Sequence, residues 1–471
     1  MRENPQKNPT NQVFFRSALG KTMNITTPKT INMMKKAIAT SLMLLLTLCA
    51  AAQFGPMTDA DTQYAGTLPK AGAMAPEVKL KTIDGKSFKL SKLRGHYVVL
   101  DFWASWCRDC RKDAPVMVDM WKRFGSRGVE FVGVSFDTDK AAWRKALEQY
   151  GIGYTQVSEL KAWKETAVSA AYGVKWIPSM VLIDPEGKVV LSTVLTDKLE
   201  RTLYEVTKAP EVNTGTQERV TIDGSKGKLA AVIQKPVLAT GERCPMVMLM
   251  HGFGGSKEGP LFEIIADSLA AHGIASIRFD FNGHGESEGD FSEMTVPNEI
   301  EDAKQVYSYV SDLRYVSSVA LVGHSQGGVV ASMTAGELTA EGVRAVVLMA
   351  PAAVLRDDAI RGSTFGKMYD PLFPPEYVEL WGGKRLGREY IKTAFSLPIY
   401  ETAARYQGQA LIVHGTGDRV VPYTYGERYH TIWPKSDYVQ LDGFDHGFSQ
   451  NIYRADRIVS EWLMEKLKIK N

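Results

Sequence analysis

The sequence has few cysteines, no long apolar run and little excess charge. Four cysteines in 471 residues are too few for a disulfide scaffold. No apolar run reaches the roughly 20 residues that a membrane-spanning helix needs. The formal net charge is only +3, and there is no basic stripe of the kind that nucleic acid demands. Internal repeats and low-complexity tracts are also missing. These absences exclude a small disulfide-bonded module and argue against a membrane span or a nucleic-acid partner.

The N-terminal segment has the three-part pattern of a secretory signal peptide. Lys35 and Lys36 precede an apolar run over 37–48, and small residues up to Ala52 follow it. A buried helix is the alternative, which the adjacent dibasic pair disfavours. Residues 1–52 carry seven basic residues and one acidic residue, so the rest of the chain has a net charge of −3. We therefore expect an N-terminal extension with a signal peptide, and an exported protein that is periplasmic or secreted.

The hydropathy pattern divides the remaining chain into two α/β domains. Short apolar strands alternate with helical segments, a polar turn-rich stretch interrupts them, and the alternation then resumes for 250 residues. Such alternation predicts a mostly parallel sheet covered on both faces in the second domain. The predicted parts are a linker (53–70), a first domain (71–206), a second linker (207–216) and a second domain (217–471) with an insertion (352–409).

A motif for a nucleophilic serine lies in the second domain. Residues 323–327 read GHSQG and fit G-x-S-x-G, in which the serine occupies a sharp strand-to-helix turn that larger neighbours would obstruct. The motif is short, but an apolar strand over 318–322 precedes it and a small-residue helix over 329–335 follows it. This context predicts Ser325 as the nucleophile of a serine hydrolase.

A serine hydroxyl needs a base and an orienting acid, and this fold uses the chain order serine, acid, histidine. Asp418 and His446 each follow an apolar strand, so both are expected at the carboxyl edge of the sheet. Asp442 and Asp445 are rival acids, but they share the loop of the histidine. We predict His446 as the base and Asp418 as the acid.

The oxyanion of an acyl-transfer reaction needs two backbone donors. The N–H of Gln326 directly follows the nucleophile, and the N–H of Phe253 lies in the loop after an earlier strand. The pattern requires neither a metal ion nor an organic cofactor. Four further polar residues of these segments are interpreted as structural: His251, His324, His414 and Asp280.

The motifs HGFGGS, DFNGHGESEG, LVGHSQGGVVASMTAG, IVHGTGDRVVP and GFDHGFS together resemble those of bacterial feruloyl (cinnamoyl) esterases, over about 220–467. The resemblance implies an α/β-hydrolase fold and hydrolysis of ferulic, caffeic or coumaric esters, often those on plant cell-wall arabinoxylan. It also implies small phenolic esters or feruloylated plant oligosaccharides as binding partners. A small insertion covers the site in that family.

The insertion over 352–409 is rich in aromatic residues, which suit a planar phenylpropenoid acyl group. The alternative is that these aromatics form the core of the small subdomain. By resemblance, Asp358 and Tyr390 hydrogen-bond the ring hydroxyls of the substrate. Phe365 stands where a relative carries Gln, which leaves the phenolic preference open.

The first domain contains a C-x-x-C pair. Cys107 and Cys110 follow a strand and begin a helix, whose N-terminus stabilises the thiolate of the first cysteine. Asp101, on the buried strand, is placed to carry the proton of Cys110, and Pro178 lies where a cis-proline would face the dithiol. Zinc is the alternative ligand, but a second ligand pair is missing from the sequence.

The stretch ending in LDFWASWC resembles exported thioredoxin-like proteins of the thiol-disulfide reductase and peroxiredoxin-related group, over about 71–206. A thiol-disulfide redox partner is implied. The pair Arg108-Asp109 replaces the usual proline-containing pair between the cysteines, which leaves the direction of electron flow open. Two alternatives remain for the whole chain. One is a general carboxylesterase or peptidase of the same fold, and the other is an oxidoreductase whose hydrolase part is a binding module.

Overall fold

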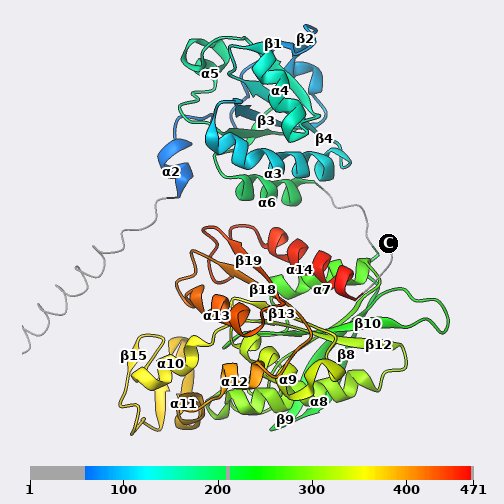
Figure 1. Ribbon diagram of the computed structural model, residues 1–471, viewed down its shortest axis with the longest axis vertical. Coiled ribbons are helices and arrows are strands. Elements are labelled where there is room, and N and C mark those ends of the chain that lie inside the picture. Colours follow the sequence, from blue (N-terminus) through cyan, green and yellow to red (C-terminus); the bar gives the residue numbers. More distant parts are fainter. Residues whose placement is uncertain (1–58, 208–212, 468–471) are drawn as a thin grey trace, which may run out of the picture. The chain divides into compact units, whose positions relative to one another are not determined.

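The computed structural model describes residues 59–207 and 213–467 (Figure 1). The predicted signal peptide and its cleavage site lie outside these residues. Within the described ranges, no helix is both long enough and apolar enough to cross a membrane. Part of the predicted linker 53–70 is helical, because α2 (Ala60–Tyr64) begins at an Asp59 carboxylate that accepts the N–H of Asp61.

The first domain is built on a seven-stranded mixed sheet with the order β2-β1-β5-β4-β3-β6-β7. Its central strands are rich in β-branched and aromatic residues and are almost wholly buried, as their apolar sequences predicted. The strands are β1 (Lys79–Thr82), β2 (Ser87–Lys89), β3 (Tyr97–Trp103), β4 (Val129–Ser135), β5 (Thr155–Ser158), β6 (Ser179–Ile183) and β7 (Val189–Thr193).

Four α-helices complete this domain, and the longest begins at the cysteine pair. Cys107 is the N-cap of α3 (Arg108–Gly125), so the expected strand–dithiol–helix order is present. The consecutive strands β6 and β7 pair antiparallel and form a hairpin. The other helices are α4 (Lys140–Tyr150), α5 (Ala167–Ala171) and α6 (Thr196–Val206).

The second domain is built on an eight-stranded sheet with the order β19-β18-β13-β12-β10-β11-β9-β8. The pairs β8–β9 and β9–β11 are antiparallel and the others are parallel, which confirms the predicted mostly parallel sheet. The strands are β8 (Thr216–Gly224), β9 (Gly227–Lys235), β10 (Cys244–Met250), β11 (Ala275–Phe279), β12 (Val316–His324), β13 (Ala345–Met349), β18 (Gln409–Gly415) and β19 (Asp437–Leu441).

Helices cover both faces of this sheet (Figure 1). Alternate residues of β10 point to opposite faces, so Met248 packs with α8 (Val296–Ser311) and α9 (Gln326–Gly342). Leu249 packs on the other face, with α7 (Pro260–Ala271) and α14 (Ile452–Lys466). A further helix, α13 (Thr424–Ile432), lies between β18 and β19 in the chain. The predicted α/β fold class is confirmed.

Between β13 and β18 the chain forms a small subdomain of short elements, drawn yellow to orange in Figure 1. It contains two short hairpins, β14–β15 and β16–β17. Its elements are α10 (Val354–Arg361), β14 (Ser363–Thr364), β15 (Lys367–Met368), β16 (Tyr377–Glu379), β17 (Arg385–Gly387), α11 (Arg388–Phe395) and α12 (Ile399–Ala403).

Candidate active sites of the two domains

Ser325 occupies a strained turn between β12 and α9. The strand ends at His324 and the helix begins at Gln326, which leaves Ser325 with φ 58° and ψ −123°. A non-glycine residue in the left-handed region costs free energy and persists only where its surroundings hold it. The Ser325 N–H donates a hydrogen bond of 2.9 Å to the carbonyl oxygen of Met349 on the neighbouring strand. The turn therefore fixes the hydroxyl at the edge of the sheet.

Glycines make this turn possible. A Cβ on Gly327 would lie 2.1 Å from the carbonyl oxygen of Met250, and one on Gly323 would lie 2.1 Å from that of Gly327. A Cβ on Gly252 would lie 2.7 Å from the Cβ of Ser325. The glycines of the motif and of the loop after β10 thus allow two backbone segments to meet at the serine.

Ser325, His446 and Asp418 form one hydrogen-bonded series. The Ser325 hydroxyl lies 2.8 Å from His446 Nε2, and His446 Nδ1 lies 2.7 Å from Asp418 Oδ2. Asp418 follows β18 and His446 follows β19, as their positions after apolar strands predicted. The rival carboxylates Asp442 and Asp445 instead bond a threonine, a serine and backbone groups. The structure therefore brings together the three residues predicted as nucleophile, base and acid.

The Asp418 carboxylate is fully buried and accepts hydrogen bonds on both oxygens. Its Oδ1 accepts the N–H groups of Val420 and Val421, each at 2.8 Å. Its Oδ2 faces His446 at 2.7 Å and His414 at 3.2 Å. Burial alone would raise the pKa of Asp418, but the hydrogen bonds from His414 and His446 hold it below its ordinary value. The contact of His414 with the acid was not foreseen from the sequence.

The two predicted oxyanion donors have no competing acceptor. In the part of the chain that the structure describes, neither the Phe253 N–H nor the Gln326 N–H donates to another group. Phe253 follows Gly252, whose backbone approaches Ser325, and Gln326 directly follows Ser325. Both N–H groups are therefore free to meet a developing oxyanion.

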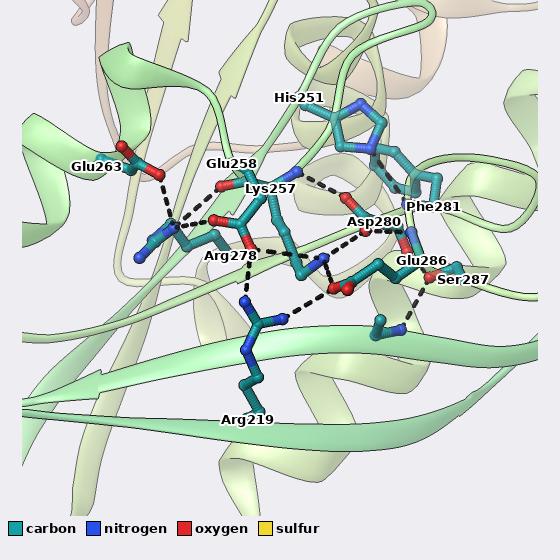
Figure 2. Close-up of polar contacts among 11 residues, drawn as sticks. Arg219, His251, Lys257, Glu258, Glu263, Arg278, Asp280, Phe281, Glu286 and Ser287 are labelled. Atoms are coloured by element: carbon teal, nitrogen blue, oxygen red, sulfur yellow. Dashed lines mark hydrogen bonds and ion pairs between the residues drawn. The ribbon is translucent and has the colours of Figure 1, made fainter.

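A buried ion pair holds the loop that carries Phe253 (Figure 2). Lys257 donates to the Asp280 carboxylate through its N–H at 2.6 Å and its Nζ at 2.8 Å, and Asp280 also accepts the N–H of Glu286. Burial would lower the pKa of Lys257, but hydrogen bonds to Asp280 and Glu286 raise it above its ordinary value. His251 Nε2 accepts the N–H of Phe281 at 3.2 Å. His251 and Asp280 thus have structural contacts.

Aromatic rings gather around Phe253. Its ring centroid lies 4.8 Å from that of Phe365, 6.1 Å from that of Trp381 and 5.8 Å from that of Tyr390. Tyr390 is buried, whereas 44% of Phe365 and 53% of Trp381 are exposed. Some of the aromatics in the small subdomain are therefore core residues, and others present their rings to solvent beside the loop of Phe253.

The two predicted substrate-binding side chains have protein partners. Asp358 forms an ion pair with Arg361 at 2.5 Å, and burial raises the pKa of Asp358 above its ordinary value. The hydroxyl of Tyr390 donates to Gln326 Oε1 at 2.7 Å. The Gln326 amide in turn donates to the buried Glu299 carboxyl group at 2.8 Å. Glu299 was not foreseen, because no motif marks it on α8.

In the first domain, Cys107 and Cys110 are joined by a disulfide. The peptide bond between Ile177 and Pro178 is cis, and the carbonyl oxygen of Ile177 lies 3.6 Å from Cys107 Sγ. The predicted cis-proline therefore faces the cysteine pair. Cys244, in the second domain, is a buried free cysteine.

Asp101 lies on β3 and lines a small cavity together with Cys110, Pro178, Asp113 and Tyr154. Burial raises the pKa of Asp101 to about 7, even though the Tyr154 hydroxyl donates a hydrogen bond to it at 2.8 Å. Burial also raises the pKa of Asp113 to about 6. Asp113 and Tyr154 were not foreseen, since neither lies in the C-x-x-C motif. Over residues 59–207 and 213–467, no group of three or more metal-binding side chains is found.

Comparison with known proteins supports both domains. Residues 71–192 match the AhpC/TSA family, and residues 241–380 match the serine aminopeptidase S33 family. The thiol-disulfide oxidoreductase ResA of Bacillus subtilis is 39% identical over 119 residues, which are 25% of this chain and 64% of that protein. ResA of Geobacillus kaustophilus is 30% identical over 166 residues, which are 35% of this chain and 92% of that protein.

The second domain resembles a solved structure described as ferulic acid bound to Est1E from Butyrivibrio proteoclasticus. The match has 27% identity and a TM-score of 0.51, and it covers 53% of this chain and 99% of that one. Through its first domain the chain belongs to the family of the thiol-disulfide oxidoreductase ResA, and this domain is fused to an esterase-like α/β-hydrolase domain.

Proposed function

We propose that the second domain is a serine esterase that hydrolyses hydroxycinnamoyl (feruloyl-type) esters. The observation that carries this proposal is the hydrogen-bonded series from Ser325 through His446 to Asp418. A buried carboxylate, an imidazole and a hydroxyl in this order make the hydroxyl a nucleophile at neutral pH. The likeness to Est1E, whose solved structure holds ferulic acid, supports a phenylpropenoid acyl group.

The proposed reaction is a two-step acyl transfer. As the Ser325 oxygen attacks the ester carbonyl carbon, His446 Nε2 takes the hydroxyl proton, and Asp418 stabilises the imidazolium. The N–H groups of Phe253 and Gln326 hold the tetrahedral oxyanion. The C–O bond to the alcohol then breaks, and the alcohol leaves with the proton from His446. Water, deprotonated by His446, attacks the acyl-enzyme in the same way and releases the acid.

The acyl group is proposed to lie against the aromatic rings around Phe253. Phe365 and Trp381 contact this ring and remain partly exposed, so a planar acyl group gains both burial and stacking there. The ring hydroxyls of the substrate are proposed to meet Asp358 and Tyr390. Small phenolic esters and feruloylated plant oligosaccharides are the proposed substrates.

The first domain is proposed to exchange its disulfide with a separate redox partner. In the dithiol form of the domain, the Cys107 thiolate attacks the partner's disulfide and releases one partner thiolate. Cys110 then attacks the Cys107 sulfur of this mixed disulfide, which releases the second partner thiolate and forms the Cys107–Cys110 disulfide that the structure contains. The signal pattern before Ala52 supports the further proposal that the protein is exported to the periplasm or secreted.

A hydrolysis panel tests the esterase proposal. Methyl ferulate, caffeate and coumarate are offered to the wild-type chain, to Ser325→Ala and to the control Ser317→Ala, which changes an exposed serine of the same strand. We expect turnover by the wild type and the control, and a loss of at least about a thousandfold in Ser325→Ala. Comparable turnover by Ser325→Ala would refute the proposal.

Three other functions are tested when aminoacyl p-nitroanilides and p-nitrophenyl acetate are added to the panel. A peptidase is the second candidate, because residues 241–380 match the serine aminopeptidase family. Faster cleavage of aminoacyl p-nitroanilides than of methyl ferulate would favour it, and faster cleavage of p-nitrophenyl acetate would favour a general carboxylesterase. If the hydrolase part were only a binding module for the redox domain, the wild type would hydrolyse none of these substrates.

A further inference from the structure

His414 is a second histidine in contact with the Asp418 carboxylate. It lies on β18, and its side chain is fully buried. His414 Nε2 lies 3.2 Å from Asp418 Oδ2 and 3.0 Å from the carbonyl oxygen of Val421. The same Oδ2 lies 2.7 Å from His446 Nδ1. Two imidazoles from different segments therefore meet one carboxylate oxygen.

The surroundings of the His414 ring decide which nitrogen carries its proton. Both neighbours of Nε2 are oxygen acceptors, so Nε2 must donate. Nδ1 is buried and has no hydrogen-bond partner among the residues that the structure describes. At this buried position, an unprotonated Nδ1 without a partner costs less free energy than an Nδ1–H without an acceptor. A Cβ on Gly426 of α13 would lie 2.6 Å from Nδ1, so the glycine makes room for the ring. His414 Nε2 thus donates toward Asp418.

We propose that His414 is a positioning residue of the esterase reaction, which draws charge from Asp418 Oδ2 and fixes this carboxylate against His446. This inference rests on the proposed function. Because Oδ2 is shared between two N–H donors, it is a weaker acceptor for each of them. His414 would therefore limit how strongly Asp418 stabilises the imidazolium form of His446. It would also keep the buried carboxylate oriented toward the base.

The third histidine nearby does not supply a competing charge. The ring centroid of His324 lies 4.9 Å from that of His446, and its Nε2 contacts the His446 carbonyl oxygen at 2.7 Å. Burial, together with His446, lowers the pKa of His324 to about 4, so His324 is neutral when the esterase works near pH 7. Asp442 and Asp445 share the loop of His446, but their carboxylates bond Thr416 and Ser449. Among the groups named here, Asp418 and His414 therefore meet His446 closely, and His324 is neutral.

A matched pair of substitutions separates the donor from the shape of the ring. His414→Phe keeps a ring of similar size and removes the N–H, whereas His414→Gln can place an amide N–H near the position of Nε2. Without the donor, Asp418 holds the His446 imidazolium more tightly. In the plot of kcat/KM against pH, we expect the midpoint of the acidic limb of His414→Phe to move up by about 0.5 pH unit or more. The plateau value of kcat/KM should fall about tenfold. His414→Gln should keep the wild-type limb and stay within about threefold of its rate.

Two readouts on the full chain keep this inference distinct from the substrate proposal. The first is the pH profile of methyl ferulate hydrolysis, and the second is the pH profile of Ser325 labelling by a fluorophosphonate, which needs no ester substrate. If the wild type is labelled but hydrolyses no hydroxycinnamoyl ester, the substrate proposal is wrong and labelling alone decides the role of His414. A wild type that is not labelled would overturn both proposals.

The thermal midpoint of each variant shows whether it has folded. If His414→Phe folds and keeps the acidic limb and the plateau of the wild type, the inference is overturned. It is also overturned if His414→Gln is impaired to the same degree as His414→Phe. If His414→Phe does not fold, His414→Asn replaces it, because the shorter amide cannot reach Asp418. The Asn variant should then show the upward shift, and the Gln variant should not.

Discussion

The hydroxyl group of Tyr390 donates a hydrogen bond of 2.7 Å to Gln326 Oε1, which ties the small subdomain to the residue that follows Ser325. The other end of the Gln326 amide donates to Glu299 at 2.8 Å. The residue whose N–H is proposed to hold the oxyanion is thus clamped from two sides. A change in the small subdomain can therefore alter the site without touching Ser325.

This clamp makes a prediction for Tyr390→Phe. Losing one hydrogen bond of about 1 kcal/mol should lower kcat/KM about fivefold. Methyl cinnamate, which has no ring hydroxyl, should show this loss, and methyl ferulate should lose more, because its ring hydroxyl is proposed to donate to the Tyr390 oxygen while Tyr390 donates to Gln326. Tyr369→Phe is the control, since the hydroxyl of Tyr369 contacts Thr364 instead. A loss confined to methyl ferulate would assign Tyr390 to the ring hydroxyl alone and contradict the prediction.

Glu299 gives a prediction about stability and pH. Burial raises the pKa of Glu299 well above its ordinary value, against the hydrogen bond from Gln326. The folded state therefore keeps the proton, while the unfolded chain loses it above about pH 4.5. The contribution of protonated Glu299 to the free energy of unfolding is complete below that pH, and it is lost as the pH rises through the pKa of Glu299 in the folded state. Glu299→Gln, which stays neutral, should be at least as stable as the wild type at pH 8.

Glu299→Ala is the matched variant, because it leaves the Gln326 amide without its acceptor. It should lose about 1 to 3 kcal/mol at pH 5. The free energy of unfolding of both variants is measured in urea at pH 5 and pH 8. The loss of Ser325 labelling is the signal, because it reports on the hydrolase domain. If Glu299→Gln were much less stable than the wild type at pH 8, the carboxyl group would have to be ionised in the folded state.

The fold and the core of the proposed site could be predicted because their signals are local. Apolar β-branched runs predicted the strands. The GHSQG turn is local as well, because a Cβ on Gly323 would clash with the carbonyl oxygen of Gly327, four residues later. The chain order of serine, acid and histidine then selected Asp418 over the carboxylates beside His446. The C-x-x-C pair at a helix start and the proline before β6 were local in the same way.

The contacts that tune these sites could not be predicted, because they join segments with no shared periodicity. Glu299 reaches Gln326 from another helix, and Tyr154 reaches Asp101 from 53 positions away. His414 was interpreted as structural, since a histidine at the end of an apolar strand has no motif that marks its neighbour. His414 lies only four residues before Asp418 in the chain, and the pairing of β18 with β19 brings His446 to the same carboxylate.

A role of Asp101 as the proton acceptor of Cys110 predicts that thiol-disulfide exchange depends on pH. Burial raises its pKa to about 7, so the carboxyl group holds a proton below that pH and can accept one above it. The step in which Cys110 attacks the mixed disulfide on Cys107 needs a proton acceptor, and its rate should rise with a midpoint near pH 7. Asp101→Asn should slow this step about a hundredfold and remove that midpoint.

Stopped-flow tryptophan fluorescence with a disulfide-bonded peptide can follow this step. Glu148→Gln is the control, because it removes an exposed carboxylate from α4, outside the C-x-x-C motif. If Asp101→Asn kept the wild-type rate and midpoint, another group would have to accept the proton of Cys110.

A substitution of Lys257 tests whether the buried ion pair of Figure 2 holds the loop that carries Phe253. Only 1% of its side chain is exposed, and its partner Asp280 is fully buried. Lys257→Met would leave this carboxylate buried without its counter-ion, which should cost about 3 kcal/mol or more. Lys228→Met is the control, because its pair with Asp223 is exposed to solvent and should contribute little to stability.

Two measurements separate a role in the loop from a role in stability alone. Thermal inactivation should be much faster in Lys257→Met than in Lys228→Met, and Asp280→Asn on the Lys257→Met background should recover part of the loss, since the unpaired charge is gone. Because the pair holds the loop of Phe253, Lys257→Met should also lower kcat more than it raises KM at a temperature where the chain stays folded. A stable Lys257→Met with wild-type kcat would show that the backbone contacts of Asp280 suffice to hold the loop.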